Sequence, residues 1–172
     1  EALAEAGAAV ARIRSMAAEW NTHPDQIAVC GFSAGGHLAA AVSVMGSERP
    51  NATILGYPCI LANMSKSQKN VLRYDVPSCD EYVDADTPPA YIFHTVSDTL
   101  VPVENSLRYA DALARAGVPF EMHLFPSGVH GLSLCDGRTS EGMAFLVNSH
   151  VAQWVPLCFA WLQGVFPNFK SE

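Results

Sequence analysis

The chain has 172 residues, which is enough for one domain with a sizeable core. Apolar residues make up 49% and charged residues 16%, a composition that argues against intrinsic disorder. The net charge of −7 and the lack of any run of Lys or Arg argue against nucleic acid as a partner, and no apolar stretch is long enough to cross a membrane.

The five cysteines are scattered along the chain, and no C-x-x-C pair occurs. This odd number and this spacing predict neither a disulfide framework nor a zinc site. Cys30 and Cys158 lie in apolar stretches, so we expect both to be small core residues. The sequence leaves the location in the cell open, with a preference for the cytoplasm.

Hydrophobic periodicity predicts strands that alternate with helices along the whole chain. Strands are expected at 27–30, 52–57, 90–95 and 120–125. Helices are expected at 2–20, 36–46, 103–116 and from about 151, with a further short helix at 66–74. This alternation predicts a three-layer α/β/α fold, in which a mainly parallel sheet carries helices on both faces.

A single domain over residues 1–172 accounts for this organisation, since no repeat or low-complexity tract interrupts it. The one insertion, 60–88, is polar and irregular and is too small to be a separate domain. We expect this insertion to form a small cap over the functional site.

The most informative motif is Gly31-Phe32-Ser33-Ala34-Gly35, between a predicted strand and a predicted helix. The pattern G-x-S-x-G in this setting is typical of a nucleophile elbow, in which Ser33 lies at the tip of a sharp, strained turn. The flanking glycines are expected to let two backbone segments approach more closely than side chains allow. An ordinary Gly-rich turn can contain the same pattern, so the interpretation depends on context. The apolar strand before the motif and the Ala-rich helix after it favour a catalytic serine.

A serine nucleophile needs an acid and a base, which follow it in the order Ser, Asp, His in enzymes with this elbow. Asp98 comes just after the strand at 90–95, at the end of the sheet where open α/β folds bind their ligands. Four other aspartates lie in the polar insertion without a strand before them: Asp75, Asp80, Asp84 and Asp86. Asp98 is therefore the predicted acid.

Six histidines compete for the role of base, and His130 alone lies in a loop directly after the last strand. It follows Asp98 at a distance that leaves room for one helix, one strand and a turn. The other five lie in a turn, within strands or on helices: His23, His37, His94, His123 and His150. His37 is close to Ser33 but comes before the acid, so we expect it to be a packing residue.

These residues predict acyl transfer through a covalent serine ester. His130 would take the proton of Ser33 as the hydroxyl attacks an ester carbonyl, and Asp98 would orient the imidazole. The backbone N–H of Ala34, at the start of the helix, is the predicted donor to the oxyanion. This chemistry requires no metal and no other cofactor.

Three blocks of the sequence, at 23–38, 87–106 and 125–132, carry a resemblance that covers almost the whole chain. With them, the chain resembles the small α/β-hydrolase esterases similar to acetyl esterases and acetyl-xylan esterases. The resemblance implies an α/β-hydrolase fold. It also implies hydrolysis of short acyl esters, often acetyl groups on sugars, with a small-molecule or carbohydrate ester as the substrate.

The resemblance stops at the front of the chain. Such esterases carry further strands and a Gly-rich loop of HGGG type that supplies other oxyanion donors, and nothing like this loop precedes Gly31. We therefore expect the C-terminal part of a hydrolase domain that lacks the N-terminal strands. The strand at 27–30 would then be an open sheet edge, which invites self-association.

Two other functions stay open. A peptidase-type or dienelactone-hydrolase-like enzyme has the same elbow. A truncated hydrolase domain could instead serve as a non-catalytic structural or interaction module. The missing Gly-rich loop favours this last reading, whereas the presence of Ser33, Asp98 and His130 opposes it.

Overall fold

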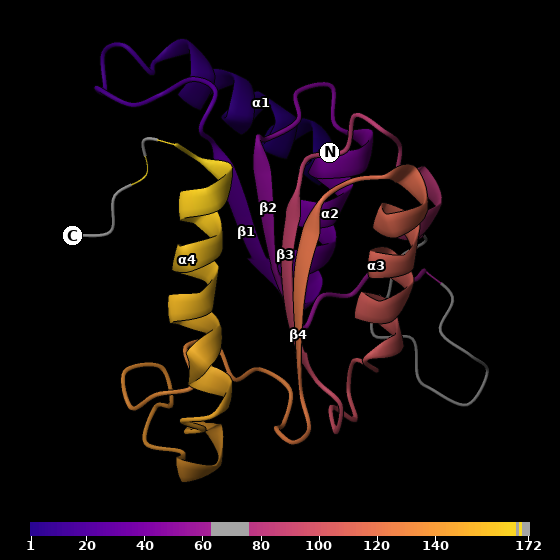
Figure 1. Ribbon diagram of the computed structural model, residues 1–172, viewed down its shortest axis with the longest axis vertical. Helices are drawn as coiled ribbons and strands as arrows, with labels where there is room; N and C mark the ends of the chain where they lie inside the picture. Colours follow the sequence, from indigo (N-terminus) through magenta and orange to yellow (C-terminus); the bar gives the residue numbers. More distant parts are fainter. Residues whose placement is uncertain (63–75, 168, 170–172) are drawn as a thin grey trace.

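The computed structural model describes residues 1–62, 76–167 and 169. Four parallel strands form one sheet, and their order across the sheet is also their order along the chain (Figure 1). The strands are β1 (Ala28–Phe32), β2 (Ala52–Gly56), β3 (Ala90–Thr95) and β4 (Phe120–Phe125). Because all four run the same way, their carboxyl ends meet at one end of the sheet.

Helices cover both faces of this sheet (Figure 1). They are α1 (Ala2–Ser15), α2 (Ser33–Met45), α3 (Glu104–Ala116) and α4 (Trp154–Val165). The helices α2 and α3 pack on one face, α1 packs on α2, and α4 packs on the opposite face. The predicted three-layer α/β/α architecture with a parallel sheet is thereby confirmed.

Both faces of the sheet are apolar because successive strand residues point to opposite sides. Leu55 and Ile92 are buried on the side of α2 and α3, whereas Ile54, Tyr91 and Phe93 are buried on the side of α4. Every residue of β2 and β3 is buried. This two-sided core holds the strand ends, and the loops that follow them, in fixed relative positions.

The edge strand β1 pairs with β2 alone among the residues that the structure describes. The predicted open edge at this strand is thus present in the described sheet. Cys30 lies on this edge strand and is exposed, which corrects its expected place in the core, whereas Cys158 of α4 is buried as expected. All five cysteines are free thiols.

The first helix, α1, ends at Ser15 rather than at the predicted residue 20. The hydroxyl of Ser15 donates to the carbonyl of Arg12, a local bond that competes with the helix ladder. Asn21 then takes a left-handed conformation with a φ of 52°, and Trp20 is exposed. Within the described residues, none of the helices is both long enough and apolar enough to span a membrane.

The C-terminal helix begins as a short 3₁₀ helix, η3 (Val151–Gln153), and continues as α4. Pro156 lies in the first turn of α4, as expected, where a missing N–H costs no hydrogen bond.

The described part of the segment between β2 and β3 packs against helices. Its 3₁₀ helix η1 (Cys79–Tyr82) contacts α2 and α3, and Cys79 is buried among them. Arg49, after α2, donates to both carboxylate oxygens of Asp84. The short helix expected at 66–74 lies outside the described residues, and a cap formed by 60–88 stays a prediction.

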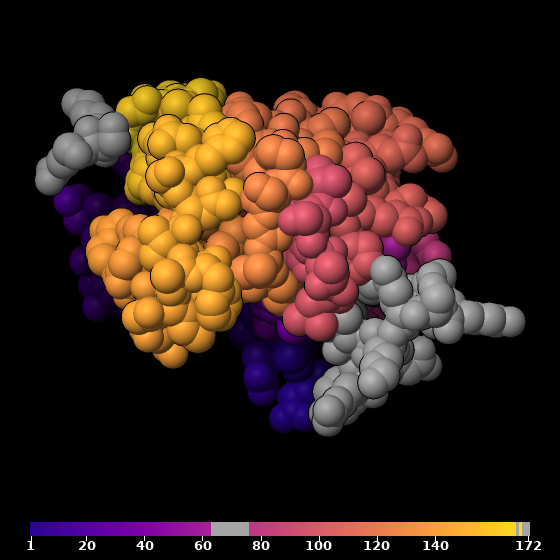
Figure 2. Space-filling view, turned by 90° about the horizontal axis from the view of Figure 1, so that it is seen from below, coloured from indigo at the N-terminus to yellow at the C-terminus, as the bar shows by residue number. Residues whose placement is uncertain are grey.

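The loops at the carboxyl ends of the strands gather on one face of the molecule, which Figure 2 views directly. The residues that follow β3, near residue 100, lie beside the long segment 126–150 that follows β4. Because α2 follows β1 directly, its N-terminus lies at this same end of the sheet. The three side chains expected to do chemistry therefore all start from one end of the sheet.

We predict that Gly31→Ala lowers the free energy of unfolding by about 1–3 kcal/mol, as overpacking does in other cores. A Cβ built at Gly31 would collide with the carbonyl oxygen of Gly35, which is backbone and cannot rotate away. The measurement is urea unfolding at neutral pH, followed by circular dichroism.

Gly35→Ala is the matched control. Outside its own helix and chain neighbours, no heavy atom of the described residues lies within 4 Å of a Cβ built there. Alanine is more favourable than glycine in a helix by about 0.5–1 kcal/mol, so this variant should be as stable as the parent or more stable. Equal losses of stability in the two variants would contradict the close approach at Gly31.

Candidate active site

Ser33 lies at the junction of β1 and α2. Its backbone φ is 53°, in the left-handed region that non-glycine residues rarely adopt. The turn is tight because Gly31 has no side chain, so that the backbone of Gly35 fills the space a Cβ would need. Of the two motif glycines, Gly31 is thus the one that the close approach requires, which corrects the expectation for Gly35. Ser33 has the strained elbow that the motif predicts.

Asp98 lies in the turn that follows β3 and is only 6% exposed. Its Oδ1 accepts hydrogen bonds from the backbone N–H groups of Leu100 and Val101, at 2.9 and 3.0 Å. Both bonds are local, so the turn itself orients the carboxylate. The second oxygen, Oδ2, faces His130.

The Asp98 carboxylate stays ionised although it is buried. Burial alone would raise the pKa of Asp98, but hydrogen bonds from two histidines and two backbone N–H groups outweigh burial and hold this pKa well below its usual range. The donors are His130, His94, Val101 and Leu100. The site therefore contains a fixed negative charge.

His130 lies in the loop after β4 and joins the other two side chains. Its Nδ1 is 2.7 Å from Oδ2 of Asp98, and its Nε2 is 2.7 Å from Oγ of Ser33. Because the carboxylate can only accept, Nδ1 carries the proton, and Nε2 of the neutral ring accepts from the Ser33 hydroxyl. Two residues 97 positions apart in sequence are thus linked through one imidazole. All three predicted side chains come together.

Several of the competing side chains have partners of their own. His37 bonds the carbonyl of Pro77, and His123 bonds Glu121. His94 bonds Ser106 and the carbonyl of Val101, and its Nε2 also lies 3.5 Å from Oδ2 of Asp98, on the side of the acid rather than of Ser33. Two aspartates form ion pairs: Asp80 with Arg108, and Asp84 with Arg49. Asp75 lies outside the described residues. His37 is a buried packing residue, as expected.

Two aromatic residues that the sequence analysis does not single out hold the loop of His130. The hydroxyl of Tyr57 accepts from the N–H of Ser133, and the indole N–H of Trp154 donates to the carbonyl of Ser133, both at 2.9 Å. The ring of Tyr57 also contacts the His130 imidazole, with centroids 4.9 Å apart. Tyr57 directly follows β2, as Asp98 follows β3, but sequence alone cannot tell such an aromatic from a core residue.

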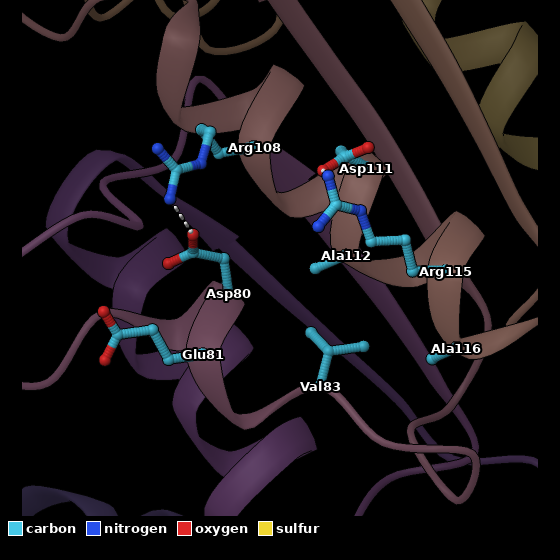
Figure 3. A pocket seen from close by; sticks show the side chains of 8 residues that line it. All are labelled: Asp80, Glu81, Val83, Arg108, Asp111, Ala112, Arg115 and Ala116. Atoms are coloured by element: carbon cyan, nitrogen blue, oxygen red, sulfur yellow. Dashed lines mark hydrogen bonds and ion pairs between the residues drawn. The ribbon is translucent and has the colours of Figure 1, made fainter.

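A cavity of about 660 Å³ lies between η1 and α3, away from these side chains (Figure 3). Its charged lining residues are Asp80, Glu81, Arg108, Asp111 and Arg115. Two ion pairs, Arg108 with Asp80 and Arg115 with Asp111, neutralise most of this charge. Neither Ser33 nor its two partners line this cavity, so it is not the place of the chemistry.

A mostly apolar cavity of about 340 Å³ does border the elbow, through Ala34 and His37. Its other lining residues extend along α2 as far as Met45 and include the start of α1, and it is not lined by Ser33, Asp98 or His130. Within the part of the chain that the structure describes, no group of three His, Cys, Asp or Glu side chains is placed to hold a metal ion.

A solved structure supports the fold independently. The structure of MGS-M1, an α/β-hydrolase enzyme from a Medee basin deep-sea metagenome library, is 39% identical to this chain with a TM-score of 0.86. The match covers 95% of this chain and 64% of that one. The fold is therefore that of the α/β-hydrolases.

Two curated relatives match most of the chain but only a part of their own length. The acetylxylan esterase of Xylanibacter ruminicola is 37% identical in an alignment of 136 residues, and the match covers 69% of this chain and 28% of the relative. The endo-1,4-beta-xylanase B of Butyrivibrio fibrisolvens is 31% identical in an alignment of 157 residues, and the match covers 78% of this chain and 25% of the relative. The chain thus spans about a quarter of the length of each.

The family assignment rests on a wider match. The model of the prolyl oligopeptidase family matches residues 8–149, which include the elbow, the turn of Asp98 and the loop of His130. With its α/β-hydrolase fold, this chain belongs to the prolyl oligopeptidase family.

Proposed function

We propose that this chain carries the catalytic residues of a serine carboxylesterase that hydrolyses short-chain acyl esters. The observation that supports the proposal most directly is the unbroken hydrogen-bonded chain from Asp98 through His130 to Ser33, with both bonds 2.7 Å long. These residue types in this geometry form the catalytic triad of serine hydrolases.

In the proposed reaction, Oγ of Ser33 attacks the ester carbonyl carbon while Nε2 of His130 takes the hydroxyl proton. The tetrahedral intermediate collapses, and the alcohol leaves with the proton from Nε2. Water then attacks the acyl-serine, His130 takes a proton from it, and the acid is released as Ser33 recovers its proton. Asp98 stabilises the imidazolium in both halves of the reaction.

The developing oxyanion is proposed to accept a hydrogen bond from the backbone N–H of Ala34. Ala34 is exposed and is the second residue of α2, where a backbone N–H has no partner within the helix. The positive end of the helix dipole adds favourable potential at this place. One such donor contributes about 2.7–4 kcal/mol to transition-state stabilisation. A complete oxyanion hole also needs a second donor from outside the elbow.

The proposed substrate is an acetyl or similar short acyl ester, on a small molecule or a carbohydrate. The relative named acetylxylan esterase supports an acetylated sugar.

The family name favours a second candidate, a peptidase that cleaves amide bonds with the same three side chains. A dienelactone-hydrolase-like enzyme is a further variant of this site. The third candidate, a non-catalytic module, is opposed by the alignment of Ser33, His130 and Asp98, because a site without catalytic use has no need for the strained φ of Ser33.

We predict that a fluorophosphonate probe labels Ser33 in the full protein that the gene encodes. Ser33→Ala should abolish labelling and lower esterase kcat by several orders of magnitude, because it removes the hydroxyl proposed to form the acyl intermediate. Ser15→Ala, which changes the serine at the end of α1, outside the proposed triad, is the control. The readout is mass spectrometry of the labelled peptide together with hydrolysis of p-nitrophenyl acetate.

The same protein should cleave p-nitrophenyl acetate much faster than the matched p-nitroanilide. Strong anilide cleavage with negligible ester cleavage would replace the esterase by the peptidase. Failure of the probe to label Ser33 would contradict both the esterase and the peptidase, and would favour the non-catalytic module.

Asp98→Asn should lower kcat by roughly 10³–10⁴-fold, since the imidazole loses the partner that sets its tautomer. It should also change stability in a pH-dependent way. The pKa of Asp98 is lowered in the folded state, so its ionised form stabilises the protein above an unfolded-state value of about 3.9. That contribution is lost as the pH falls below this value.

The destabilisation caused by Asp98→Asn should therefore be largest between about pH 5 and 7 and should shrink below about pH 4. Urea unfolding of both proteins over this pH range measures the difference. A difference that does not vary with pH would contradict the lowered pKa.

We also propose that the open edge of β1 pairs with a strand of a second copy when no other strand covers it. Unpaired backbone groups of an edge strand are a ready template for another chain. Residues 1–172 should then associate reversibly with rising concentration, as measured by analytical ultracentrifugation. Ala28→Lys places a charge at an exposed position of β1 and should weaken this association.

Thr22→Lys adds the same charge at an exposed position outside the sheet and should have no effect. A chain that stays monomeric at all concentrations would show that this edge is not an association surface.

A further inference from the structure

Tyr57 directly follows β2 and neither forms a covalent bond nor transfers a proton in the proposed reaction, yet its backbone is strained. Its φ is 35°, in the left-handed region, although it is neither glycine nor asparagine. Its N–H donates to the carbonyl of Phe93 at 2.7 Å, so the strained turn is fixed by the neighbouring strand β3. Strain of this kind persists only where the surrounding structure enforces it, and it concentrates at functional sites.

The side chain of Tyr57 is 5% exposed and reaches the loop that carries His130. Its hydroxyl accepts the N–H of Ser133 at 2.9 Å, and its ring meets the His130 ring edge on, at 4.9 Å and 69°. Burial raises the pKa of Tyr57 to about 12, so the hydroxyl stays neutral and takes no part as a base at neutral pH. The Tyr57 side chain can instead fix the loop that carries His130.

The loop that carries His130 depends on tertiary contacts for its conformation, because its backbone is not in regular secondary structure. Gly131, next to His130, has a φ of 84°, and Ser133 has a φ of 52°. Both backbone polar groups of Ser133 are hydrogen-bonded. Its N–H donates to the Tyr57 hydroxyl, and its carbonyl accepts from the Trp154 indole. The loop is thus tied to β2 on one side and to α4 on the other.

The same aromatic ring contacts the residue before the nucleophile. Tyr57 lies 5.8 Å from the ring of Phe32, which precedes Ser33, and 5.6 Å from the ring of Phe93. Trp154 stacks on Phe93 at 4.4 Å and meets Phe32 at 5.8 Å. One aromatic cluster therefore contacts both the residue before the nucleophile and the loop of the base.

We infer that Tyr57 is a positioning residue, which keeps Nε2 of His130 at hydrogen-bond distance from Oγ of Ser33. This inference rests on the proposed function, because it assigns Tyr57 a role in the same triad. It acts through the hydroxyl, by fixing the Ser133 peptide, and through the ring, by limiting the tilt of the imidazole. A loop that drifts by about 1 Å can cost around 100-fold in rate.

Tyr57→Phe tests the hydroxyl with little change in packing, and Tyr91→Phe is its matched control. Tyr91 is fully buried in the same aromatic region, and its hydroxyl also bonds a backbone group, the carbonyl of Trp154, at 2.9 Å. Each variant loses one buried hydroxyl that is bonded to backbone. Only Tyr57→Phe frees a peptide in the loop of His130.

We expect Tyr57→Phe to lower kcat for p-nitrophenyl acetate about 10-fold or more with KM nearly unchanged. Tyr91→Phe should keep kcat within about twofold while the melting temperatures of the two variants fall by similar amounts. Equal kcat values for the two variants would overturn the inference. So would a Tyr57→Phe variant that changes KM alone.

A second readout does not depend on turnover. The proton between Nδ1 of His130 and Asp98 should give a low-field proton NMR signal, which should broaden in Tyr57→Phe and persist in Tyr91→Phe. An unchanged signal in Tyr57→Phe would also overturn the inference. The two hypotheses can fail separately. A wild type that gives this signal but neither labels at Ser33 nor cleaves esters would contradict the proposed function. The NMR signals of the two variants would still test whether Tyr57 positions His130.

Discussion

The backbone turn at Ser33 is the constraint on which the rest of the site depends. A φ of 53° in a serine costs free energy, and the turn forms only because Gly31 lets the backbone of Gly35 come close. The turn points a hydroxyl out of the carboxyl end of the sheet and starts a buried helix immediately behind it. In the proposed mechanism, His130 and Asp98 can act only if they are linked by hydrogen bonds to the hydroxyl oxygen of Ser33.

Parallel strand order explains how the other members reach it. The sheet order follows the chain order, so the loops after β1, β2 and β3 lie next to one another, and the loop after β4 comes next. Ser33, Tyr57 and Asp98 follow three successive strands. His130 follows the fourth and returns over the strand ends to lie between Asp98 and Ser33. Because β2 and β3 are buried on both faces, these starting points cannot shift independently.

Features of this chain that depend on one local signal can be predicted from its sequence. The burial of polar side chains is harder to predict, because it depends on hydrogen bonds to distant residues. The apolar pattern of α3 singles out residues 107, 110, 113 and 114, yet Leu107 is exposed. The buried face instead includes Asn105, Ser106 and Tyr109. Ser106 is drawn inward because its hydroxyl bonds the buried His94, and Asn105 because its side-chain oxygen accepts two backbone N–H groups. Hydropathy does not register such bonds.

The sequence by itself determined the fold class, and it predicted the elbow at Ser33 with Asp98 and His130 as its partners, because chain order and position after a strand are local properties. Only the tertiary structure decided that these three side chains meet at 2.7 Å, since the contacts join residues 32 and 97 positions apart. It alone revealed Tyr57 and Trp154 around Ser133 and the exposure of Cys30 on the edge strand. The physical reason is that a side chain's neighbours across a sheet depend on how all the strands pack, which no single stretch of sequence contains.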